Sequence, residues 1–271
     1  MTIILVDPDL CTRCGICSEV CPMSIIEPAD EKNLPKIRDE IEVCIACGHC
    51  EAFCPSQALL LNLRPDEKVD LPDGAGELPA GDLGWYLKKR RSVRHFTGEP
   101  VSREDILQVL DIARYAASGC NGQPVEWIVI HDPERVNRIA GLTIDWMRTL
   151  VGTSHPLSNF VTPLISAWEA GYDPICRNAP HMIISHIPED NPMNIADAII
   201  ALTHFDISAP AFGIGTCWAG FVAHALLEYR PLQEEIALPK GRIPSFAIFF
   251  GHPKYQAYGI PRRKPLQVTW L

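Results

Sequence analysis

Hydrophobic and polar residues between positions 102 and 113 repeat with the spacing of an amphipathic helix. Ser102 stands three residues before Asp105, which is typical of the capping box that starts such a helix. The apolar positions share one side of the helix, and they are Ile106, Val109, Leu110 and Ala113. The pattern therefore predicts a helix packed on a sheet.

Three other stretches have helical signals. Asp132 followed by Pro133 is a typical helix start. A short helix capped by Asp82 is expected to end in the basic residues 88–91. Residues 192–212 are apolar nearly all round, which predicts a buried helix. Periodicity alone does not distinguish a core helix from a helix at a subunit interface.

The chain divides at residues 64–81, which contain three prolines and three glycines and show almost no periodicity. Such a composition predicts a linker between a small domain, residues 1–63, and a larger one, residues 82–271. The apolar segments 1–10 and 58–65 at the ends of the small domain have the character of short strands, and we expect them to pair.

Composition narrows the possible functions. The net charge of −9 gives no overall electrostatic attraction for nucleic acid. The chain shows no N-terminal signal pattern and no apolar run expected to cross a bilayer, so we expect a soluble cytoplasmic protein. In a reducing compartment clustered cysteines more often bind metal than form disulfides.

Eight of the eleven cysteines fall in two runs, CTRCGICSEVCP at 11–22 and CIACGHCEAFCP at 44–55. The spacing C-x2-C-x2-C-x3-C-P is that of bacterial iron–sulfur proteins, in which the fourth cysteine of each run ligates the other cluster. The pattern predicts two 4Fe-4S clusters, one held by Cys11, Cys14, Cys17 and Cys54 and the other by Cys44, Cys47, Cys50 and Cys21. The alternatives are two zinc knuckles or a disulfide scaffold.

Residues 1–63 resemble a two-cluster bacterial ferredoxin module, which implies that this domain moves single electrons. Gly15 and Gly48 suit the backbone bends of the two cysteine loops. A core this small is marginal alone, so most of the stability of the domain should come from its clusters.

Arg90, Ser92 and Arg94 alternate, so in an extended segment their side chains share one side and suit a phosphate dianion. The sequence RRSVRHF at 90–96 resembles the opening motif of the nitroreductase family of flavoproteins. This resemblance implies that Arg90, Arg91, Ser92 and Arg94 hold the phosphate of FMN.

Later segments resemble the same family in order, so that the resemblance covers residues 82–271. Residues 113–130 resemble its helix, flavin-contacting loop and strand, residues 178–185 a core strand, and residues 195–220 a long helix and the strand beside the flavin. The resemblance implies that the polar loop residues and two late arginines contact FMN, namely Ser118, Asn121, Gln123, Arg262 and Arg263. It also implies an α+β fold with a mixed or antiparallel central sheet flanked by helices, and a homodimer with FMN near the interface.

The segment GIGTCWAG at 213–220 lacks the third glycine of a dinucleotide-binding turn, since Trp218 stands there. We therefore expect no such site. In the nitroreductase family the backbone after this tryptophan faces the flavin N5, which implies contacts from Ala219, Gly220 and Phe221.

The remaining candidates have simpler interpretations. Cys120 and Cys217 fall near the expected flavin, but buried free cysteine usually serves as a small hydrophobe, and the same holds for Cys176. No histidine spacing indicates a metal site. Residues 142–176 occupy a variable region of the family that covers the active site. Its aromatic residues could line a pocket or belong to the core, and they are Trp146, Phe160, Trp168 and Tyr172.

The two domains together suggest an enzyme that converts single electrons into pairs, with the chemistry carried by FMN rather than by a catalytic side chain. We expect electrons to pass from a low-potential donor such as ferredoxin through the clusters to FMN, which then reduces a nitroaromatic, a quinone or a similar molecule. One alternative is oxidation of NAD(P)H with electrons leaving through the clusters. Others are a non-catalytic electron-transfer subunit and a flavin-fragmenting or dehalogenating enzyme.

Overall fold

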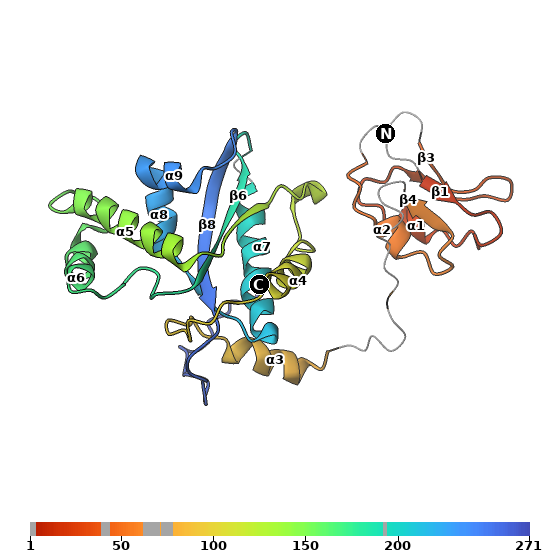
Figure 1. Ribbon diagram of the computed structural model, residues 1–271. Helices are drawn as coiled ribbons and strands as arrows, with labels where there is room; N and C mark the ends of the chain where they lie inside the picture. The colour runs from red at the N-terminus through yellow and green to blue at the C-terminus, as the bar shows by residue number, and fades with distance from the viewer. Residues whose placement is uncertain (1–3, 39–43, 62–70, 72–77, 192–193) are drawn as a thin grey trace. The chain divides into compact units, whose positions relative to one another are not determined.

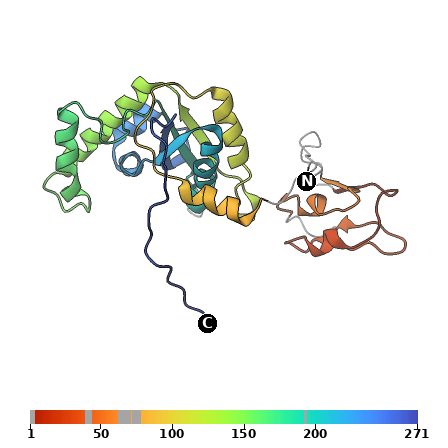
Figure 2. The same ribbon diagram turned by 90° about the horizontal axis from the view of Figure 1, so that it is seen from below.

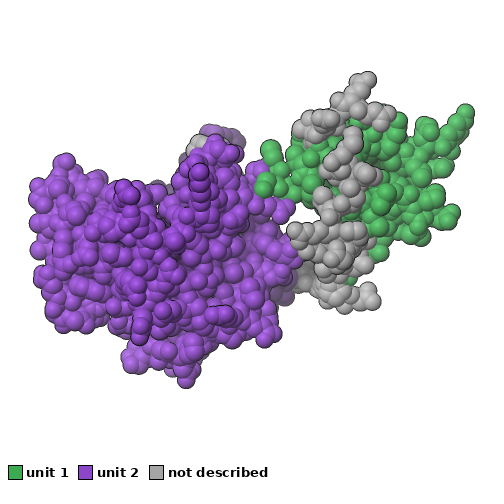
Figure 3. Space-filling model, turned by 45° about the horizontal axis from the view of Figure 1, so that its top comes forward, with its two compact units in different colours: residues 1–77, 120–122 green, residues 78–119, 123–271 purple. Residues whose placement is uncertain are grey.

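The computed structural model describes residues 4–38, 44–61, 71, 78–191 and 194–271. The chain forms two compact units, residues 1–77 with 120–122 and residues 78–119 with 123–271 (Figure 3). Most of the predicted linker, residues 64–70 and 72–77, lies outside the described residues. Its last two residues, Ala80 and Gly81, already belong to a helix, so this end of the predicted linker was placed too late.

In its described residues, the first unit consists of two two-stranded antiparallel sheets and two single-turn helices. Strand β1 (Ile4–Val6) pairs antiparallel with β4 (Leu59–Leu61), which confirms the predicted pairing of the two ends of the domain. Strand β2 (Ile26–Glu27) pairs with β3 (Lys36–Ile37). The buried core is small, and its members are Ile25, Ile26, Cys50, Leu59 and Leu61.

The two helices of this unit begin in the same way. Helix α1 (Ile16–Glu19) follows Gly15, and α2 (His49–Ala52) follows Gly48. Both glycines have left-handed backbone angles, with φ of 79° and 75°, which residues with a side chain rarely adopt. The internal repeat in the sequence is therefore also a repeat in the structure.

The second unit is built on a four-stranded sheet with the order β5-β6-β8-β7 (Figure 1). Its strands are β5 (Glu126–Ile130), β6 (His181–Pro188), β8 (Arg242–Gly251) and β7 (Gly215–Trp218). Every neighbouring pair is antiparallel. This confirms the predicted α+β class. Of the two expected kinds of sheet, mixed or antiparallel, the structure has the antiparallel one.

Helices cover both faces of this sheet (Figure 1). Successive strand residues point to opposite faces, so Met182 and Ile184 join one core while Ile183 joins the other. Helices α5 (Pro133–Leu150), α6 (Ser158–Glu169), α8 (Gly220–Glu228) and α9 (Arg230–Ile236) contribute to the first core. Helices α4 (Arg103–Ala113) and α7 (Asn194–Ser208) contribute to the second.

Two of the three predicted helix starts are confirmed. The Ser102 hydroxyl accepts the N–H of Asp105 at 3.0 Å, and the Asp132 carboxylate accepts the N–H of Glu134 at 2.9 Å. The prediction for Asp82 was wrong, because α3 (Ala80–Lys89) is preceded by Pro79 and Asp82 lies in its first turn. There the carboxylate still faces the positive end of the helix dipole.

Helix α7 is only partly buried. Leu202 and Phe205 pack in the core, whereas Ile195 and Ile200 are 46% and 39% exposed in the single chain. Burial of this second side at a subunit interface stays a prediction. By length and composition alone, residues 194–212 could cross a bilayer, contrary to the sequence expectation. The helix instead packs against β6 and β8 and buries Asp197 and Asp206, as a core helix of this unit.

Two stacked histidines join the start of α4 to the sheet. The rings of His131 and His181 lie 4.2 Å apart, and His181 Nε2 accepts the N–H of Val101 at 2.9 Å. His131 Nε2 lies 2.7 Å from the carbonyl oxygen of Val101. The pKa of His181 is lowered to about 4, chiefly by burial and also by charge repulsion from His131 and His252, while the hydrogen bond to the backbone of His131 opposes the shift.

This buried histidine predicts a loss of stability in acid. The pKa of His181 is lower in the folded state, so only the unfolded chain gains a proton as the pH falls below about 6.5. We expect this group to remove on the order of 2 kcal/mol of unfolding free energy between pH 7 and pH 4. Urea unfolding followed by tryptophan fluorescence measures it, because all six tryptophans lie in residues 85–270. His181→Gln should unfold with a shallower pH dependence, and an unchanged dependence would contradict the assignment.

Candidate functional site

The first unit contains two hollows, each lined by four cysteines. One hollow, of about 380 Å³, is lined by Cys11, Cys14, Cys17 and Cys54. The other, of about 360 Å³, is lined by Cys21, Cys44, Cys47 and Cys50. These are the two crossed sets predicted from the sequence, and the fold brings each set together because α1 packs against α2.

The cysteine sets suit clusters better than single ions. Among the described residues, no group of three or more histidine, cysteine or acidic side chains is close enough to hold one metal ion. Zinc would need its sulfur ligands about 2.3 Å from one centre. Each hollow instead has apolar walls and four separated thiols. This arrangement fits a metal cluster, which is larger than a single ion.

The protonation of these thiols depends on whether metal is bound. Burial raises the pKa of Cys50 to about 12 and also raises the pKa of Cys17. At Cys54 burial acts in the same direction, but hydrogen bonds from Ser56 and nearby backbone N–H groups outweigh it and lower the pKa. Metal coordination stabilises thiolates directly, so the buried thiols are expected to ionise only with metal bound.

In the second unit, the segment 90–96 runs along the edge strand β7. The N–H of Val93 donates to the carbonyl of Thr216 at 2.9 Å. A Cβ added at Gly215 would lie 2.7 Å from Val93 Cγ2, so only glycine lets the segment approach this closely. This contact positions the predicted phosphate-binding motif.

Arg94 lines a depression of about 770 Å³ in this unit. Ala219, Gly220 and Phe221, the predicted flavin contacts, lie in the same depression. The other lining residues are mostly apolar: Leu157, Pro174, Ile175, Arg177, Cys217, Trp218, Val222, His224 and Phe249. The fold thus brings the guanidinium group of Arg94, the start of a helix and an apolar surface together in one depression.

Helix α8 begins at this depression. The N–H of Ala219 donates to the carbonyl of Ala247 at 2.8 Å, so it is not a free donor. The N–H groups of Gly220 and Phe221 lie in the first turn of α8, where no carbonyl of the helix can accept them. Of the three predicted backbone positions, these two can therefore donate to a ligand.

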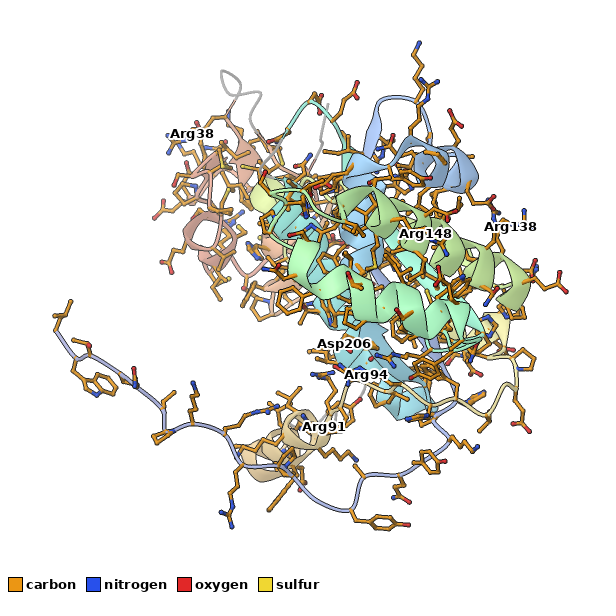
Figure 4. All side chains as sticks on the ribbon, turned by 90° about the vertical axis from the view of Figure 1, so that its left-hand side faces the viewer. Arg38, Arg91, Arg94, Arg138, Arg148 and Asp206 are labelled. Atoms are coloured by element: carbon orange, nitrogen blue, oxygen red, sulfur yellow. The ribbon has the colours of Figure 1, made fainter. Side chains whose placement is uncertain are left out.

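Arg90 takes a different direction from Arg94. Its Nη1 lies 3.5 Å from the buried carboxylate of Asp206, which also accepts Trp218 Nε1–H at 3.1 Å and the hydroxyl of Thr216. Figure 4 shows Asp206 and Arg94. Arg90 Nη1 is buried and makes no hydrogen bond within the described part of the chain. Asp206 links the motif to the Trp218 strand. Arg91 directly follows Arg90 after α3 and is half-buried.

The polar loop after α4 forms a second, separate depression. Ser118 and Gln123 line it together with Trp127 and Asp197. The Ser118 hydroxyl accepts the N–H of Gln123 at 3.0 Å, and Asp197 accepts the N–H of Gly119 at 3.0 Å. The backbone angles of Asn121 and Gln123 are left-handed. One chain therefore does not bring Ser118 and Gln123 to Arg94, and their contact with FMN stays a prediction.

Arg262 and Arg263 lie in the exposed C-terminal segment, which runs away from the sheet of this unit (Figure 2). Neither lines the depression of Arg94. Within one chain the structure does not bring them to the site, and a role toward FMN stays a prediction.

The aromatic residues of the variable region also lie elsewhere. Trp146 is buried and donates to Glu228 at 3.2 Å, and Trp168 packs against Gly141 in the core. Phe160 is 62% exposed and Tyr172 46% exposed. None of the four lines the depression, which takes Leu157, Pro174 and Ile175 from this part of the chain instead. The pocket alternative is thus not supported for these aromatics.

Three cysteines lie outside the two cysteine runs, and the two buried ones show no activation. Burial raises the pKa of the Cys217 thiol, although Arg94, Ser92 and Arg177 oppose this. Cys176 is fully buried, and its pKa lies well above the usual value. Both are protonated at neutral pH, in keeping with packing roles. Cys120 is exposed and has a left-handed backbone.

Arg177 is the arginine of the lining that sequence reasoning missed. A signal was present, because Asp173 precedes it by four residues and aspartate commonly organises such turns through its side chain.

Comparison with known proteins identifies both units. Residues 87–252 match the model of the nitroreductase family, and residues 3–68 match that of the 4Fe-4S dicluster domain. The chain therefore belongs to the nitroreductase family and carries a dicluster domain ahead of it.

Individual relatives agree with this assignment. The chain is 29% identical over 179 residues to the FMN reductase [NAD(P)H] of Bacillus subtilis, covering 65% of this chain and 68% of that protein. It is 25% identical over 166 residues to a putative NADH dehydrogenase/NAD(P)H nitroreductase of Archaeoglobus fulgidus, covering 61% and 82%. The fold is shared with a nitroreductase with bound FMN from Desulfitobacterium hafniense, at a TM-score of 0.56 and 20% identity, covering 69% and 96%. The cofactor predictions, FMN and two 4Fe-4S clusters, agree with these matches.

Proposed function

We propose that the protein is an iron–sulfur flavoprotein oxidoreductase that passes electrons from two 4Fe-4S clusters to FMN and on to an electron-poor small molecule, such as a nitroaromatic or a quinone. The observation that carries this proposal is the presence, in one chain, of two four-cysteine hollows and a cationic depression with free backbone donors. Clusters transfer one electron at a time, whereas a flavin also transfers electron pairs as hydride.

The residues of the second unit have definable parts in this function. Arg94 supplies a cation for the phosphate or the ring edge of FMN. We propose that Ser92 adds its hydroxyl and Arg90 its Nη1, which makes no hydrogen bond in the described part of the chain. The N–H groups of Gly220 and Phe221 favour negative charge on the group bound against them. The apolar side chains of Ile175 and Phe249 offer a surface for a flat ring.

A second copy of the chain completes this proposal. Nitroreductases are typically FMN-binding homodimers. Helices α4 and α7, which pack together, expose the apolar side chains of Leu107, Ile112, Ile195 and Ile200. We place the dimer contact there, and we propose that Ser118, Asn121 and Gln123 reach the FMN of the other subunit. Reduced thiols and clusters favour the cytoplasm as the location.

A second direction of electron flow is supported by one observation. The Bacillus subtilis relative is named for reduction by NAD(P)H. In this alternative NAD(P)H reduces FMN in the same depression, and the clusters carry electrons out to a partner protein.

Anaerobic stopped-flow spectroscopy separates the two directions. The purified protein is mixed with reduced ferredoxin, NADH or NADPH, and flavin absorbance is followed. We expect ferredoxin to bleach the flavin fastest, and a Cys54→Ser variant, which lacks one predicted cluster ligand, to be slower with ferredoxin only. Fast bleaching by a pyridine nucleotide, unaffected by Cys54→Ser, would favour the reverse flow instead.

A further inference from the structure

The loop before β6 is organised by a buried carboxylate. Asp173 is only 3% exposed and accepts three backbone N–H groups, those of Ile175, Cys176 and Asn178, each at 2.9 Å. The loop ends with Arg177 and Asn178 in the left-handed region, with φ of 60° and 54°. Two successive left-handed residues with side chains are unfavourable, so the Asp173 hydrogen bonds hold Arg177 in a conformation that it would not adopt alone.

This conformation places Arg177 in the depression that Arg94 lines. The two arginines come from segments more than eighty residues apart in sequence. The guanidinium of Arg177 lies 5.3 Å from the ring centre of Tyr172, and its Nη1 donates to the Tyr172 hydroxyl. Tyr172 therefore supports the guanidinium without neutralising it.

Neither arginine has an acidic partner in the described part of the chain. Arg90 faces Asp206, and Arg242 faces Glu126, but no described carboxylate lies within 4.0 Å of Arg94 or Arg177. The charges of Arg94 and Arg177 both act on the Cys217 thiol, because both oppose the rise in its pKa. Two uncompensated guanidinium groups in one depression form a site for an anion.

The rest of the lining restricts the shape of the ligand. Pro174, Ile175, Phe221 and Phe249 make an apolar surface next to the cations. A flat aromatic group would cover this surface while its oxyanion meets the arginines.

We infer that Arg177 is a second anion-binding arm of this site, which acts with Arg94 on an oxyanion carried by an aromatic ligand. The inference rests on the proposed function and adds to it the chemical class of the ligand. Two ligands have this chemistry: FMN itself, through its phosphate, and an electron-poor aromatic acceptor that carries a carboxylate.

Binding measurements distinguish the two sources. Arg177→Gln removes the charge with little loss of size, Arg177→Lys keeps the charge, and Arg138→Gln is the control on α5, away from the depression. Flavin-free protein is titrated with FMN and with riboflavin, which lacks the phosphate. The flavin-loaded protein is titrated with 4-nitrobenzoate and with its uncharged methyl ester. Tryptophan fluorescence checks that each variant is folded.

We expect Arg177→Gln to weaken one charged ligand at least tenfold and to leave its uncharged partner unchanged, with Arg177→Lys closer to the original protein. Weakened FMN with unchanged riboflavin assigns Arg177 to the phosphate. Weakened 4-nitrobenzoate with unchanged ester assigns it to the acceptor. Equal affinities of Arg177→Gln and the original protein for all four ligands would overturn the inference. Protein that binds FMN but reduces neither the nitro compounds nor a quinone would contradict the proposed function, while these binding constants would still decide the role of Arg177.

Discussion

Removal of iron is expected to unfold residues 4–38 and 44–61 while the second unit stays folded with its FMN bound. The first unit has strands of two or three residues and helices of four, and its fully buried core is very small. Such a core does not offset the conformational entropy of the chain, so metal binding supplies the free energy of folding. The second unit has two extensive cores that contain none of the eight predicted ligands.

The measurement is anaerobic treatment with a chelator and an oxidant, followed by hydrogen exchange of the backbone amides. Amides of residues 4–38 and 44–61 should lose protection as iron and sulfide leave, whereas tryptophan fluorescence, which reports only on residues 85–270, should stay unchanged. Persistent protection of residues 4–38 and 44–61 in iron-free protein would contradict the prediction. Before this treatment, a Cys120→Ser variant, which changes an exposed cysteine outside both hollows, should contain as much iron as the original protein.

The crossed cysteine sets also predict which of the two clusters each cysteine substitution affects. Cys54 lines the hollow of the first run and Cys21 that of the second run. Cys54→Ser should therefore perturb the cluster of Cys11, Cys14 and Cys17, and Cys21→Ser the other one, each affecting about four of about eight iron atoms. Iron analysis with electron paramagnetic resonance of the reduced protein tests this. The same cluster signal lost in both variants would argue against separate sites.

Arg94→Ala is expected to release most of the FMN without changing the iron content. Arg94 lines the depression, and no described carboxylate pairs with it, so its charge is available to the ligand. A hydrogen bond to a charged group contributes about 1.5–3 kcal/mol, which corresponds to a loss of affinity of roughly 10- to 150-fold. Fluorescence titration of flavin-free protein with FMN measures the change.

Arg138→Ala is the matched control, because Arg138 is an exposed arginine on α5 that pairs with Glu235 (Figure 4). It should bind FMN as the original protein does. Stoichiometric FMN retained by Arg94→Ala after dialysis would refute the assignment of Arg94.

Local signals in the sequence predicted much of this structure. The starts of α4 and α5 depend on a side chain and an N–H group two or three residues apart, so Ser102 and Asp132 identified them. The pairing of β1 with β4 followed from two apolar segments at the ends of a small domain. The prediction that Asp82 caps α3 was wrong because α3 starts one turn earlier, at a position with no side-chain cap.

The cation site was harder to predict because it depends on distant contacts. Alternation along residues 90–94 grouped Arg90 with Arg94, but the fold provides Asp206 as a partner for Arg90 and none of the described carboxylates for Arg94. Arg177 carries no motif of its own. It reaches the depression because Asp173 holds its loop and because β6, β8 and β7 lie side by side.

Residue type and short spacing are properties of the covalent chain, so the cysteine runs, the glycines before α1 and α2, and the cofactor classes could be read without a structure. Which arginine meets a buried carboxylate, and which faces an open depression, depends on packing between segments that are far apart in sequence. The same is true of Ala219, whose N–H is taken by Ala247 of the neighbouring strand. Only the tertiary structure could decide these points, because each depends on a hydrogen bond or charge supplied by another element.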